Sequence, residues 1–438
     1  MAGPLPPSPS RTAEPALNSL RIALLTYRGN RHCGGQGVYA RHLSSALADL
    51  GHHVEVFSGP PYPELDGRVL LQRVPGLDLY RPRDPFRRPR LAELEHWTHV
   101  LELGVASTAG FPEPLAFSLR ARRLLAGRRV DFDVVHDNQS LGHGLLAIAA
   151  PRPRGLGLPV LATIHHPVTI DRRVELAHAP DWKRRLSLRR FYGFTRMQTR
   201  VARRLPRILT VSQASLDDIV AEHGVDPGRL AVVPAGVDAD RWRPLPAVAR
   251  VPGRLMTTAS ADVSLKGLAH LLEALAKVRV EHPRAELVVV GAPRPGSPLP
   301  GLVERLGLAG AVRFLSGVSD DGMVELYAQA EVAVVPSLYE GFSLPAVEAM
   351  ACGVPVVATT GGALPEVVGG AGVLVAPADA GALAGAITSL LGDAPRRSVL
   401  GRAGRQRAVE RFGWRAAALA TVEQYRHVIA RSGLPTPC

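Results

Sequence analysis

The sequence predicts an α/β protein built from two doubly wound parallel-sheet domains. Its 438 residues are too many for one hydrophobic core and suit two domains of about 200 residues each. Residues 21–58 hold an apolar run, a glycine-rich loop, a helical repeat and an alternating run, which together form the opening unit of a parallel sheet. The same kind of pattern restarts at residue 255, after the Pro- and Arg-rich stretch 241–253, which we interpret as an inter-domain linker.

In the first half, we expect a strand over Arg21–Tyr27 and a loop over Gly34–Gly37. Apolar residues at helical spacing then predict a helix over 38–50, and His53–Ser58 alternates like a strand. Residues 75–130 are interrupted by Arg and Pro, and the pattern there defines no element. Further buried strands are expected at 133–136, 160–164 and 208–211.

The second half alternates strands and helices more regularly. Strands are expected at 255–259, 286–290, 312–315, 332–335 and 354–357, helices at 267–280, 321–330 and 345–351, and a last helix at 414–429. We therefore divide the chain into a disordered leader over 1–19, a first domain over 20–246, a second over 247–413 and a terminal helix over 414–432 that packs back on the first domain. Ligands of open parallel sheets bind beyond the carboxyl ends of the strands, so the site is expected where two such edges face each other.

Composition excludes several classes of protein. No apolar run approaches the roughly 18 residues of a membrane span, and the Pro-rich first 19 residues lack the apolar core of a secretory signal. Cys33, Cys352 and Cys438 are far apart and predict neither a disulfide framework nor a metal site, so we expect a cytoplasmic protein. The net charge of +13 comes from 49 arginines and three lysines. This imbalance reflects base composition more than a nucleic-acid surface, and nucleic acid is not an expected partner.

The segment Pro336–Gly353 carries the most chemical information. A strand is expected to end just before it, and Pro345 suits the first position of a helix. The free N–H groups around Ser343 and Leu344 would then form a helix N-terminus that suits a phosphate.

Two glutamates flank this helix N-terminus. Glu348 lies four residues after Leu344, one turn along the same face, where its carboxylate could accept two hydrogen bonds from a ribose diol. Glu340 lies in the loop before the helix and would reach the group beyond the phosphate. The alternative is that both glutamates only favour the helix dipole.

This segment resembles the E-x7-E motif of the retaining glycosyltransferases of family 4, with Glu340 and Glu348 as its acids. The resemblance covers nearly the whole chain from residue 20, and its other pieces occur in the family order: Gly34–Gly37, Val233–Asp238, Lys266-Gly267 and Gly361–Glu366. It implies the GT-B fold, in which two Rossmann-like domains face each other across a cleft. It also implies that the second domain holds most of a nucleotide-sugar donor, that the first holds a hydroxyl acceptor, and that transfer retains configuration without an obligatory metal.

The resemblance also assigns donor-binding positions. It implies that Gly341, Phe342, Ser343 and Leu344 contact the donor beside Glu340 and Glu348, and that Gly35 and Gly37 lie over its phosphate and sugar. The glycine loop alone would fit many nucleotide-binding folds.

A separate argument supports a functional role for Lys266. This lysine stands at the start of an amphipathic helix, where a cation opposes the helix dipole, and a bound diphosphate would reverse that penalty by pairing with the ammonium. The alternative is a solvated lysine. Relatives commonly carry an arginine a few residues earlier, where this chain has Ser260.

His165 follows the strand at 160–164 and matches the family histidine that contacts the transferring sugar; the alternative is a structural histidine at a strand end. His166, next to it, would point the opposite way. His136 and His143 fit acceptor contacts or packing equally well. Ser212 suits the N-cap of a helix better than a ligand contact.

We therefore predict a retaining glycosyltransferase in which Lys266 stabilises the leaving diphosphate, Glu340 binds sugar hydroxyls and His165 contacts the sugar. The alternatives are a nucleotide-sugar epimerase of the same architecture, which would need further acids in the site, and a catalytically silent sugar-nucleotide-binding protein. No metal is expected, because the sequences Asp131-Phe132-Asp133 and Asp238-Ala239-Asp240 fall at a strand start and before the linker. Nothing in the sequence identifies the donor base, the sugar, the acceptor or the oligomeric state.

The segment 182–204 combines nine Lys and Arg residues with Phe191, Tyr192 and Phe194. A basic helix with apolar residues can lie on an anionic membrane, so peripheral contact with the inner face of a membrane is one interpretation. The other interpretation is an Arg-rich solvated face.

Overall fold

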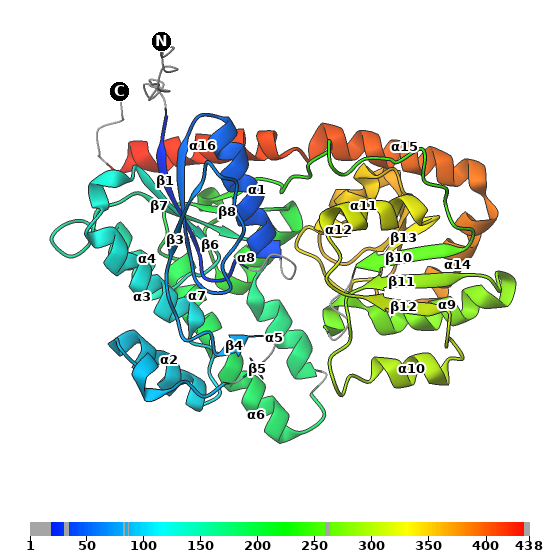
Figure 1. Ribbon diagram of the computed structural model, residues 1–438. Helices are drawn as coiled ribbons and strands as arrows, with labels where there is room; N and C mark the ends of the chain where they lie inside the picture. Colours follow the sequence, from blue (N-terminus) through cyan, green and yellow to red (C-terminus); the bar gives the residue numbers. More distant parts are fainter. Residues whose placement is uncertain are drawn as a thin grey trace, which may run out of the picture.

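The computed structural model describes residues 19–29, 35–81, 84–85, 87–177, 179–258 and 263–432. These residues form two Rossmann-like α/β domains joined side by side, with helices on both faces of each sheet (Figure 1). The predicted fold class is confirmed.

The first sheet has seven parallel strands. Their order across the sheet is β3 (Leu70–Arg73), β2 (His53–Ser58), β1 (Arg21–Thr26), β6 (Val134–Asn138), β7 (Val160–Ile164), β8 (Ile208–Thr210) and β9 (Leu230–Val232). The helices of this domain are α1 (Gly35–Asp49), α2 (Trp97–Ser107), α3 (Glu113–Ala126), α4 (His143–Ala149), α5 (Val168–Ala177), α6 (Trp182–Phe191), α7 (Thr195–Ala202) and α8 (Gln213–His223). A short antiparallel pair, β4 (Tyr80–Arg81) and β5 (Asp84–Pro85), lies outside the main sheet.

The second sheet has six parallel strands. Their order is β12 (Val312–Leu315), β11 (Glu286–Val290), β10 (Arg254–Thr258), β13 (Val332–Val335), β14 (Val356–Thr359) and β15 (Val373–Val375). The helices are α9 (Leu268–Glu281), α10 (Leu299–Arg305), α11 (Asp320–Gln329), α12 (Leu344–Ala351), α13 (Leu364–Val368), α14 (Ala380–Gly392) and α15 (Ala394–Arg411), and the chain continues into α16 (Trp414–Arg431).

Alternating side chains along each central strand fill two different cores. In β1, Ile22 and Leu24 belong to one buried cluster, whereas Ala23 and Leu25 belong to the cluster on the other face. The first of these clusters continues into the second domain and includes Met256 of β10. The two domains therefore share one hydrophobic core and keep a separate one each on their far faces.

The chain passes between the domains at two adjacent points. Val237 and Gly413 form a parallel β-bridge, and a β-carbon on Gly236 would lie 2.4 Å from the backbone nitrogen of Trp414. After Val237 the chain already packs on the second domain, because Trp242 is buried against Tyr327 with ring centroids 6.0 Å apart. The structure thus places the change of domain nearer residue 237 than residue 247.

The terminal helix α16 returns to the first domain. It packs against α1 (Figure 1), where the ring of Trp414 stacks on His42 at 5.3 Å and meets Tyr39 edge-on at 5.8 Å. Further along α16, the Tyr425 hydroxyl is 2.8 Å from His136 Nδ1 in β6.

The region 75–130, where the sequence pattern defined no element, contains α2 and α3. Their apolar periodicity is hidden because buried positions hold polar groups: Arg120 Nη2 of α3 donates to Glu102 Oε2 of α2 at 2.6 Å, and both residues are at least nine-tenths buried. A buried ion pair of this kind removes the hydrophobic signal on which a sequence-based prediction depends.

Candidate active site

The candidate site lies where the strand order of each sheet reverses. β1 lies between β2 and β6 in the first sheet, and β10 lies between β11 and β13 in the second. Connections leave in opposite directions at such points, so a crevice opens beyond the carboxyl ends of the strands. β6 ends at Asn138 and His165 follows β7, while Lys266 and Glu340 lie in the segments after β10 and β13.

Lys266 and Glu340, which are 74 residues apart, form an ion pair. Lys266 Nζ donates to Glu340 Oε1 at 2.7 Å, and Ser337 Oγ donates to the same oxygen at 2.6 Å. Glu340 is 9% exposed and the Lys266 side chain is 31% exposed. Within the described chain, no hydrogen bond uses Glu340 Oε2 or the other ammonium donors of Lys266. The pair therefore presents a cation beside a carboxylate oxygen that can still accept.

Glycines allow this ion pair to form. Gly267 has a φ of +64°, and a β-carbon there would lie 2.0 Å from the Pro336 carbonyl oxygen. Gly362 has a φ of +61°, and a β-carbon there would lie 2.2 Å from the Glu340 carbonyl oxygen, which accepts the Ala363 N–H at 2.8 Å. Only glycine fits these close approaches. The glycines of the Lys266-Gly267 and Gly361–Glu366 motifs thus hold the ion pair in place.

Gly341 brings the two domains into contact at the site. A β-carbon on it would lie 2.4 Å from the His165 carbonyl oxygen. Ser212 Oγ donates to the Gly341 carbonyl oxygen at 2.6 Å, and Ser215 Oγ lies 3.1 Å from that oxygen and 2.9 Å from the His165 carbonyl oxygen. Ser212 also accepts the Ser215 N–H at 3.0 Å as the N-cap of α8, which is the structural role expected for it. The loop of Glu340 therefore rests on the segment that carries His165.

The imidazole of His165 is held in one orientation. Its Nε2 is 2.7 Å from Asn138 Oδ1, and Asn138 Nδ2 donates to the Gln36 carbonyl oxygen at 2.9 Å. The Asn138 oxygen must then accept, so Nε2 carries the proton and Nδ1 is an acceptor. Tyr39 meets the ring edge-on at 4.7 Å, and Gln139 Oε1 accepts the His165 N–H at 2.8 Å. Burial, together with the adjacent histidine, lowers the pKa of His165 to about 3, and the ring is neutral at pH 7.

His166 points to different neighbours and was not among the predicted site residues. Its Nε2 is 2.8 Å from Asp171 Oδ2, and its ring lies 6.1 Å from that of Tyr339. Burial acts to lower the pKa of His166, but the charge of Asp171 and the hydrogen bond to it outweigh burial, so the pKa is raised. The charges of Lys266 and Glu340 also act on His166, whose Cβ would lie 3.1 Å from a β-carbon on Gly341, the residue after Glu340. The position next to His165 was its only sequence signal.

The start of α12 holds a buried hydroxyl that has no hydrogen-bond partner in the described part of the chain. Ser343 precedes the helix with a φ of 86°, a left-handed conformation that is rare for residues other than glycine. It is 4% exposed, and its hydroxyl has no hydrogen-bond partner among the residues that the structure describes. One turn along the helix, burial raises the pKa of Glu348 to about 8, and Asp320 adds to the effect. The Glu348 carboxyl is thus largely protonated at neutral pH.

The other residues predicted to contact the donor lie in different environments. Phe342 is 7% exposed and meets Phe412 edge-on at 5.4 Å, so its ring belongs to the core and only its backbone is left for a ligand. Leu344 is the first residue of α12 and packs partly against the same core. Gly35 and Gly37 lie in the first turn of α1 rather than in a loop before it. The prediction placed the start of this helix at residue 38, three residues too late. Glycines contribute no apolar side chain to the helical repeat on which that prediction depended.

Three further residues noted in the sequence, His136, His143 and Ser260, differ in where they lie. His136 is fully buried and its Nε2 lies 2.7 Å from Thr163 Oγ1, in addition to the contact with Tyr425, so packing is its role. His143 opens α4 and lines a cavity in the first domain. Ser260 lies outside the described residues. Asn138, Gln139 and Ser337 were missed, because amides and hydroxyls after strands carry no distinctive spacing.

The described part of the chain contains no group of three or more His, Cys, Asp or Glu side chains that could hold a metal ion. In the same residues, no helix combines the length and apolar character needed to cross a membrane. The segment 182–204 forms α6, the short 3-10 turn Tyr192–Phe194 and α7. Trp182 and Leu186 are 70% and 46% exposed on α6, whereas Leu188 and most of one face of α7 are buried.

Comparison with known proteins identifies the family. A model described as Glycosyltransferase Family 4 matches residues 33–241, and one described as Glycosyl transferases group 1 matches residues 252–393. The MMP alpha-(1->4)-mannosyltransferase of Mycolicibacterium hassiacum is 55% identical over 417 residues, which cover 94% of this chain and 99% of that protein. The chain is a family 4 glycosyltransferase. A D-inositol 3-phosphate glycosyltransferase of Catenulispora acidiphila is 32% identical to this glycosyltransferase over 94% of the chain and 95% of the relative.

Solved structures agree with this fold. The glycosyltransferase superposes on the sucrose-phosphate synthase of Thermosynechococcus elongatus with a TM-score of 0.70 and 25% identity, covering 94% of this chain and all of the other. HepE from Anabaena, solved with UDP and glucose, gives a TM-score of 0.67 at 19% identity, covering 93% and 99% of the two chains. The GT-B architecture predicted from the sequence is confirmed.

Proposed function

We propose that this glycosyltransferase moves a hexose, with mannose as the first candidate, from a nucleoside-diphosphate sugar to a hydroxyl acceptor with retention of configuration. The observation that carries the proposal is the Lys266–Glu340 pair, at 2.7 Å, beside the N-terminal end of α12 and against the segment of His165. A cation, a helix N-terminus and a free carboxylate oxygen are the groups that a sugar diphosphate requires.

Departure of the nucleoside diphosphate places negative charge on its β-phosphate. The ammonium of Lys266 and the N–H groups at Ser343 and Leu344 would stabilise that charge where it develops. The left-handed Ser343 and its unpaired hydroxyl add a donor in the same place. Glu340 Oε2 would accept from a sugar hydroxyl while Oε1 stays bonded to Lys266 and Ser337.

Glu348 would hold the ribose of the donor. Its carboxyl is protonated in the buried site, and two hydroxyl donors from a diol would supply the hydrogen bonds that favour the carboxylate. Nucleotide binding would then release a proton from Glu348. Gly35 and Gly37, in the first turn of α1, would lie over the phosphate and sugar.

The mannose assignment rests on the relative that is 55% identical, whose name specifies an alpha-(1->4)-mannosyltransferase. If the donor is an α-linked nucleoside-diphosphate mannose, an α-linked product means retention. His165 is neutral and its Nδ1 is an acceptor, so it would bind a sugar hydroxyl rather than attack carbon. We assign no residue as a covalent nucleophile; attack would occur on the face from which the diphosphate leaves, and the phosphate would take the proton of the acceptor hydroxyl.

No obligatory metal is part of the proposal, because Lys266 and the α12 N-terminus supply the counter-charge that a divalent cation would otherwise provide. We also propose a cytoplasmic enzyme that contacts an anionic membrane through the exposed Trp182 and Leu186 of α6. The two relatives described above are both named as transferases, which favours transfer over epimerisation or silent binding.

The direct test incubates the protein with UDP-, GDP- and ADP-mannose and the corresponding glucose donors in the presence of methyl α-mannoside. We expect one nucleotide to support a product whose mass equals sugar plus acceptor, in buffer with EDTA as well as with magnesium. Turnover that requires a divalent cation would contradict the proposal that the reaction needs no metal. Donor isomerisation without product would favour the epimerase.

A further inference from the structure

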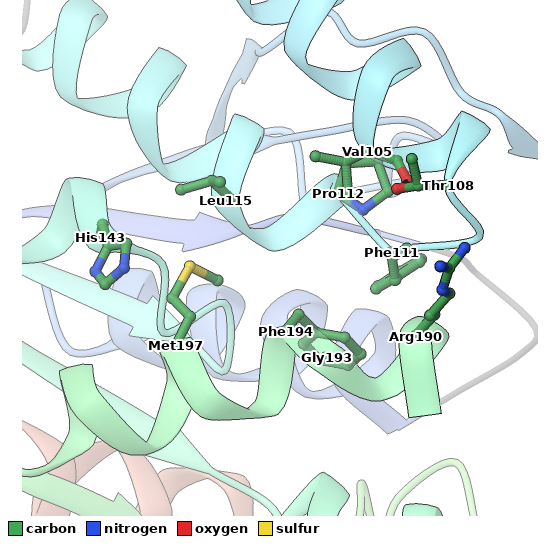
Figure 2. Close-up of a pocket in the computed structure, with 11 residues that line it drawn as sticks. Val105, Thr108, Phe111, Pro112, Leu115, His143, Arg190, Gly193, Phe194 and Met197 are labelled. Carbon is green, nitrogen blue, oxygen red and sulfur yellow. Dashed lines mark hydrogen bonds between the residues drawn. The ribbon is translucent and has the colours of Figure 1, made fainter. Parts of the chain in front are cut away.

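The first domain contains a polar cavity that differs in chemistry from the one that His143 lines. The cavity of His143 lies between α2, α3 and the α6–α7 segment, and Figure 2 shows Phe111, Phe194 and Met197 around it. The polar cavity lies between α5, α7 and the end of α8. Its volume is about 480 Å³, within the range of roughly 300–1,000 Å³ that small-molecule sites occupy. We call it the α5–α7 pocket.

Positive charge dominates the lining of the α5–α7 pocket. Its charged residues are Arg172 and Arg173 of α5, Arg196 of α7 and Glu222 of α8. Arg173 Nη1 donates to Glu222 Oε1 at 2.7 Å, so this pair carries no net charge. Arg172 and Arg196 leave two positive charges, which match the charge of about −1.5 to −2 that a phosphate monoester carries near pH 7. Among the described residues that line the pocket, only Leu176 is apolar, so the pocket does not suit an acyl chain.

Two polar atoms in the wall of the pocket have no partner. Arg172 Nε and Thr169 Oγ1 are buried, and neither makes a hydrogen bond within the described part of the chain. The two residues are three positions apart on α5 and therefore lie on the same face of that helix. An unpaired buried polar group destabilises the arrangement that contains it. A side-chain rotation that turned these atoms toward a ligand oxygen would break no hydrogen bond and would satisfy both atoms.

An Arg-rich solvated surface does not account for these arginines. A solvated arginine keeps its guanidinium in water, as the exposed Arg200 does one turn beyond Arg196 on α7. Arg172 is instead partly buried, and its Nε is out of contact with solvent. Within the residues that the structure describes, no carboxylate pairs with Arg172 or Arg196. Guanidinium groups bind phosphate oxygens through parallel N–H donors, so phosphate is the ligand that these side chains favour.

The pocket is distinct from the candidate active site, although α5 and α8 take part in both. On α5, Asp171 Oδ2 lies 2.8 Å from His166 Nε2 of the candidate site, whereas Arg172, the next residue, lines the pocket. On α8, Ser212 caps the end that meets the candidate site. Glu222 lies about 15 Å further along that helix. The two sites can therefore be tested separately.

We propose that the α5–α7 pocket binds a phosphate group, carried by a small soluble metabolite or free in solution, as a ligand site separate from the donor site. The phosphate would lie between Arg172 and Arg196 and accept a hydrogen bond from the Thr169 hydroxyl. The volume of the pocket leaves room for the rest of a molecule such as a sugar phosphate. This inference does not depend on the proposed function, because no residue of the pocket takes part in the proposed transfer.

Thermal-shift titrations with inorganic phosphate and with glucose 6-phosphate test the site. Sodium chloride and sodium acetate at equal ionic strength are the controls for screening and for a planar anion. Both phosphates should raise the melting temperature as a saturable function of concentration, beyond any effect of the control salts. Tighter binding of glucose 6-phosphate would identify a metabolite as the source of the phosphate, and equal binding would identify free phosphate.

Variants locate the binding in the pocket. Arg172→Gln and Arg196→Gln should each weaken phosphate binding by at least about ten-fold, equivalent to about 1.4 kcal/mol. Thr169→Val should weaken binding without lowering the melting temperature of the ligand-free protein, because it removes a hydroxyl that has no partner. Arg200→Gln is the matched control, since Arg200 is exposed on the same helix as Arg196 and does not line the pocket.

The Lys266→Ala protein separates this site from the donor site, because inorganic phosphate can also pair with Lys266. Phosphate binding should persist in Lys266→Ala and be lost when Arg196→Gln is added. Arg196 is exposed, so its substitution keeps the test decisive if Arg172→Gln does not fold. Absence of nucleotide binding by the parent, with phosphate binding that depends on Arg196, would count against the proposed function alone.

Three results would overturn the assignment of the α5–α7 pocket. The first is a stabilisation that chloride or acetate reproduces. The second is phosphate binding that is unchanged in both Arg172→Gln and Arg196→Gln. The third is phosphate binding that disappears in Lys266→Ala and survives in Arg196→Gln, since this would place the phosphate in the donor site.

Discussion

The two domains fix their candidate site residues by different means. In the second domain, Lys266 and Glu340 are positioned by backbone approaches that require Gly267 and Gly362. In the first domain, His165 is positioned by side-chain amides, with Asn138 on its ring and Gln139 on its backbone. Backbone contacts survive substitution of most neighbouring side chains, whereas side-chain contacts change with almost any substitution.

This difference has a functional consequence. If the second domain holds the donor and the first the acceptor, as proposed, a donor site built on glycines can be shared by enzymes with different acceptors, while an acceptor site built on side chains can diverge. Changes on the donor side should therefore affect transfer to every acceptor, and changes on the acceptor side should affect some acceptors more than others.

The largest expected effect is that of Lys266→Ala. Removing one partner of a buried charge pair costs about 2–5 kcal/mol, and it also leaves Glu340, at 9% exposed, without its cation. Transfer to all acceptors and affinity for the nucleoside diphosphate should fall by at least about 30-fold, a factor that corresponds to 2 kcal/mol. Steady-state kinetics and calorimetric titration with the nucleoside diphosphate measure both quantities.

Lys266→Arg is the matched control for charge. A planar guanidinium does not reproduce the geometry of a compact ammonium between Glu340 and a phosphate, so it should restore little activity. A Lys266→Ala protein with transfer and diphosphate affinity within about two-fold of the parent, or about 0.4 kcal/mol, would show that the second domain does not use this cation.

The next largest effects distinguish Glu348 from Glu340. Glu348→Gln removes the carboxylate proposed for the ribose and should weaken binding of the free nucleoside diphosphate. Glu340→Gln should spare that affinity and lower turnover. Loss of a charged hydrogen bond in a buried site corresponds to roughly 1.5–3 kcal/mol, about ten- to a hundred-fold. Equal losses of nucleotide affinity in both variants would mean that the roles are wrongly divided.

Glu348 also predicts a pH dependence. Its pKa is raised to about 8 in the folded protein, so the folded state binds the proton more tightly than the unfolded chain, and this contribution to stability is lost as pH rises from 4.5 through about 8. Glu348→Gln should therefore gain thermal stability over the parent increasingly across that window, by at least about 1.4 kcal/mol, equivalent to one pKa unit. Nucleotide affinity of the parent should rise over the same window. A constant difference in melting temperature between pH 5 and pH 8.5 would contradict the raised pKa.

A smaller effect is expected at the contact between the domains. Gly341→Ala would place a β-carbon 2.4 Å from the His165 carbonyl oxygen, and overpacking of this kind costs about 1–3 kcal/mol. Transfer should fall with little change in nucleotide affinity, since the substitution separates His165 from the donor side. Gly385→Ala in α14 is the control, because a β-carbon there would meet no other atom within 4 Å, and alanine should stabilise the helix by about 0.5–1 kcal/mol.

The smallest expected effect concerns the membrane. Flotation with acidic liposomes should recover part of the protein at physiological salt, and the double change of Trp182 and Leu186 to Ser should reduce that fraction while leaving transfer to soluble acceptors intact. Neutral liposomes provide the comparison, because attraction to anionic lipid depends on the basic residues of α6. Equal recovery of both proteins on acidic vesicles would identify α6 as a solvated face.

The sequence predicted the second domain better than the first, for physical reasons. The strands around Val332–Val335 and the motif from Glu340 to Glu348 combine regular apolar runs with glycines and Pro345, and each of these leaves a local signal. The side chains that hold His165 leave none, because Asn138 and Gln139 act only after β6 and β7 have come together. The first-domain cavity that His143 lines is formed by residues that are far apart in the chain, such as Phe111 and Phe194, and no sequence spacing predicts it.

The proposed reaction is transfer of a hexose from a nucleoside-diphosphate sugar at the Lys266–Glu340 site, with retention of configuration. An NMR time course with α-linked nucleoside-diphosphate mannose and methyl α-mannoside tests this reaction most directly. We predict that an α-anomeric signal of the new linkage appears from the first turnovers, with one nucleoside diphosphate released for each linkage formed. A β-linked first product would contradict retention, and no consumption of the UDP, GDP or ADP sugars would contradict the donor class.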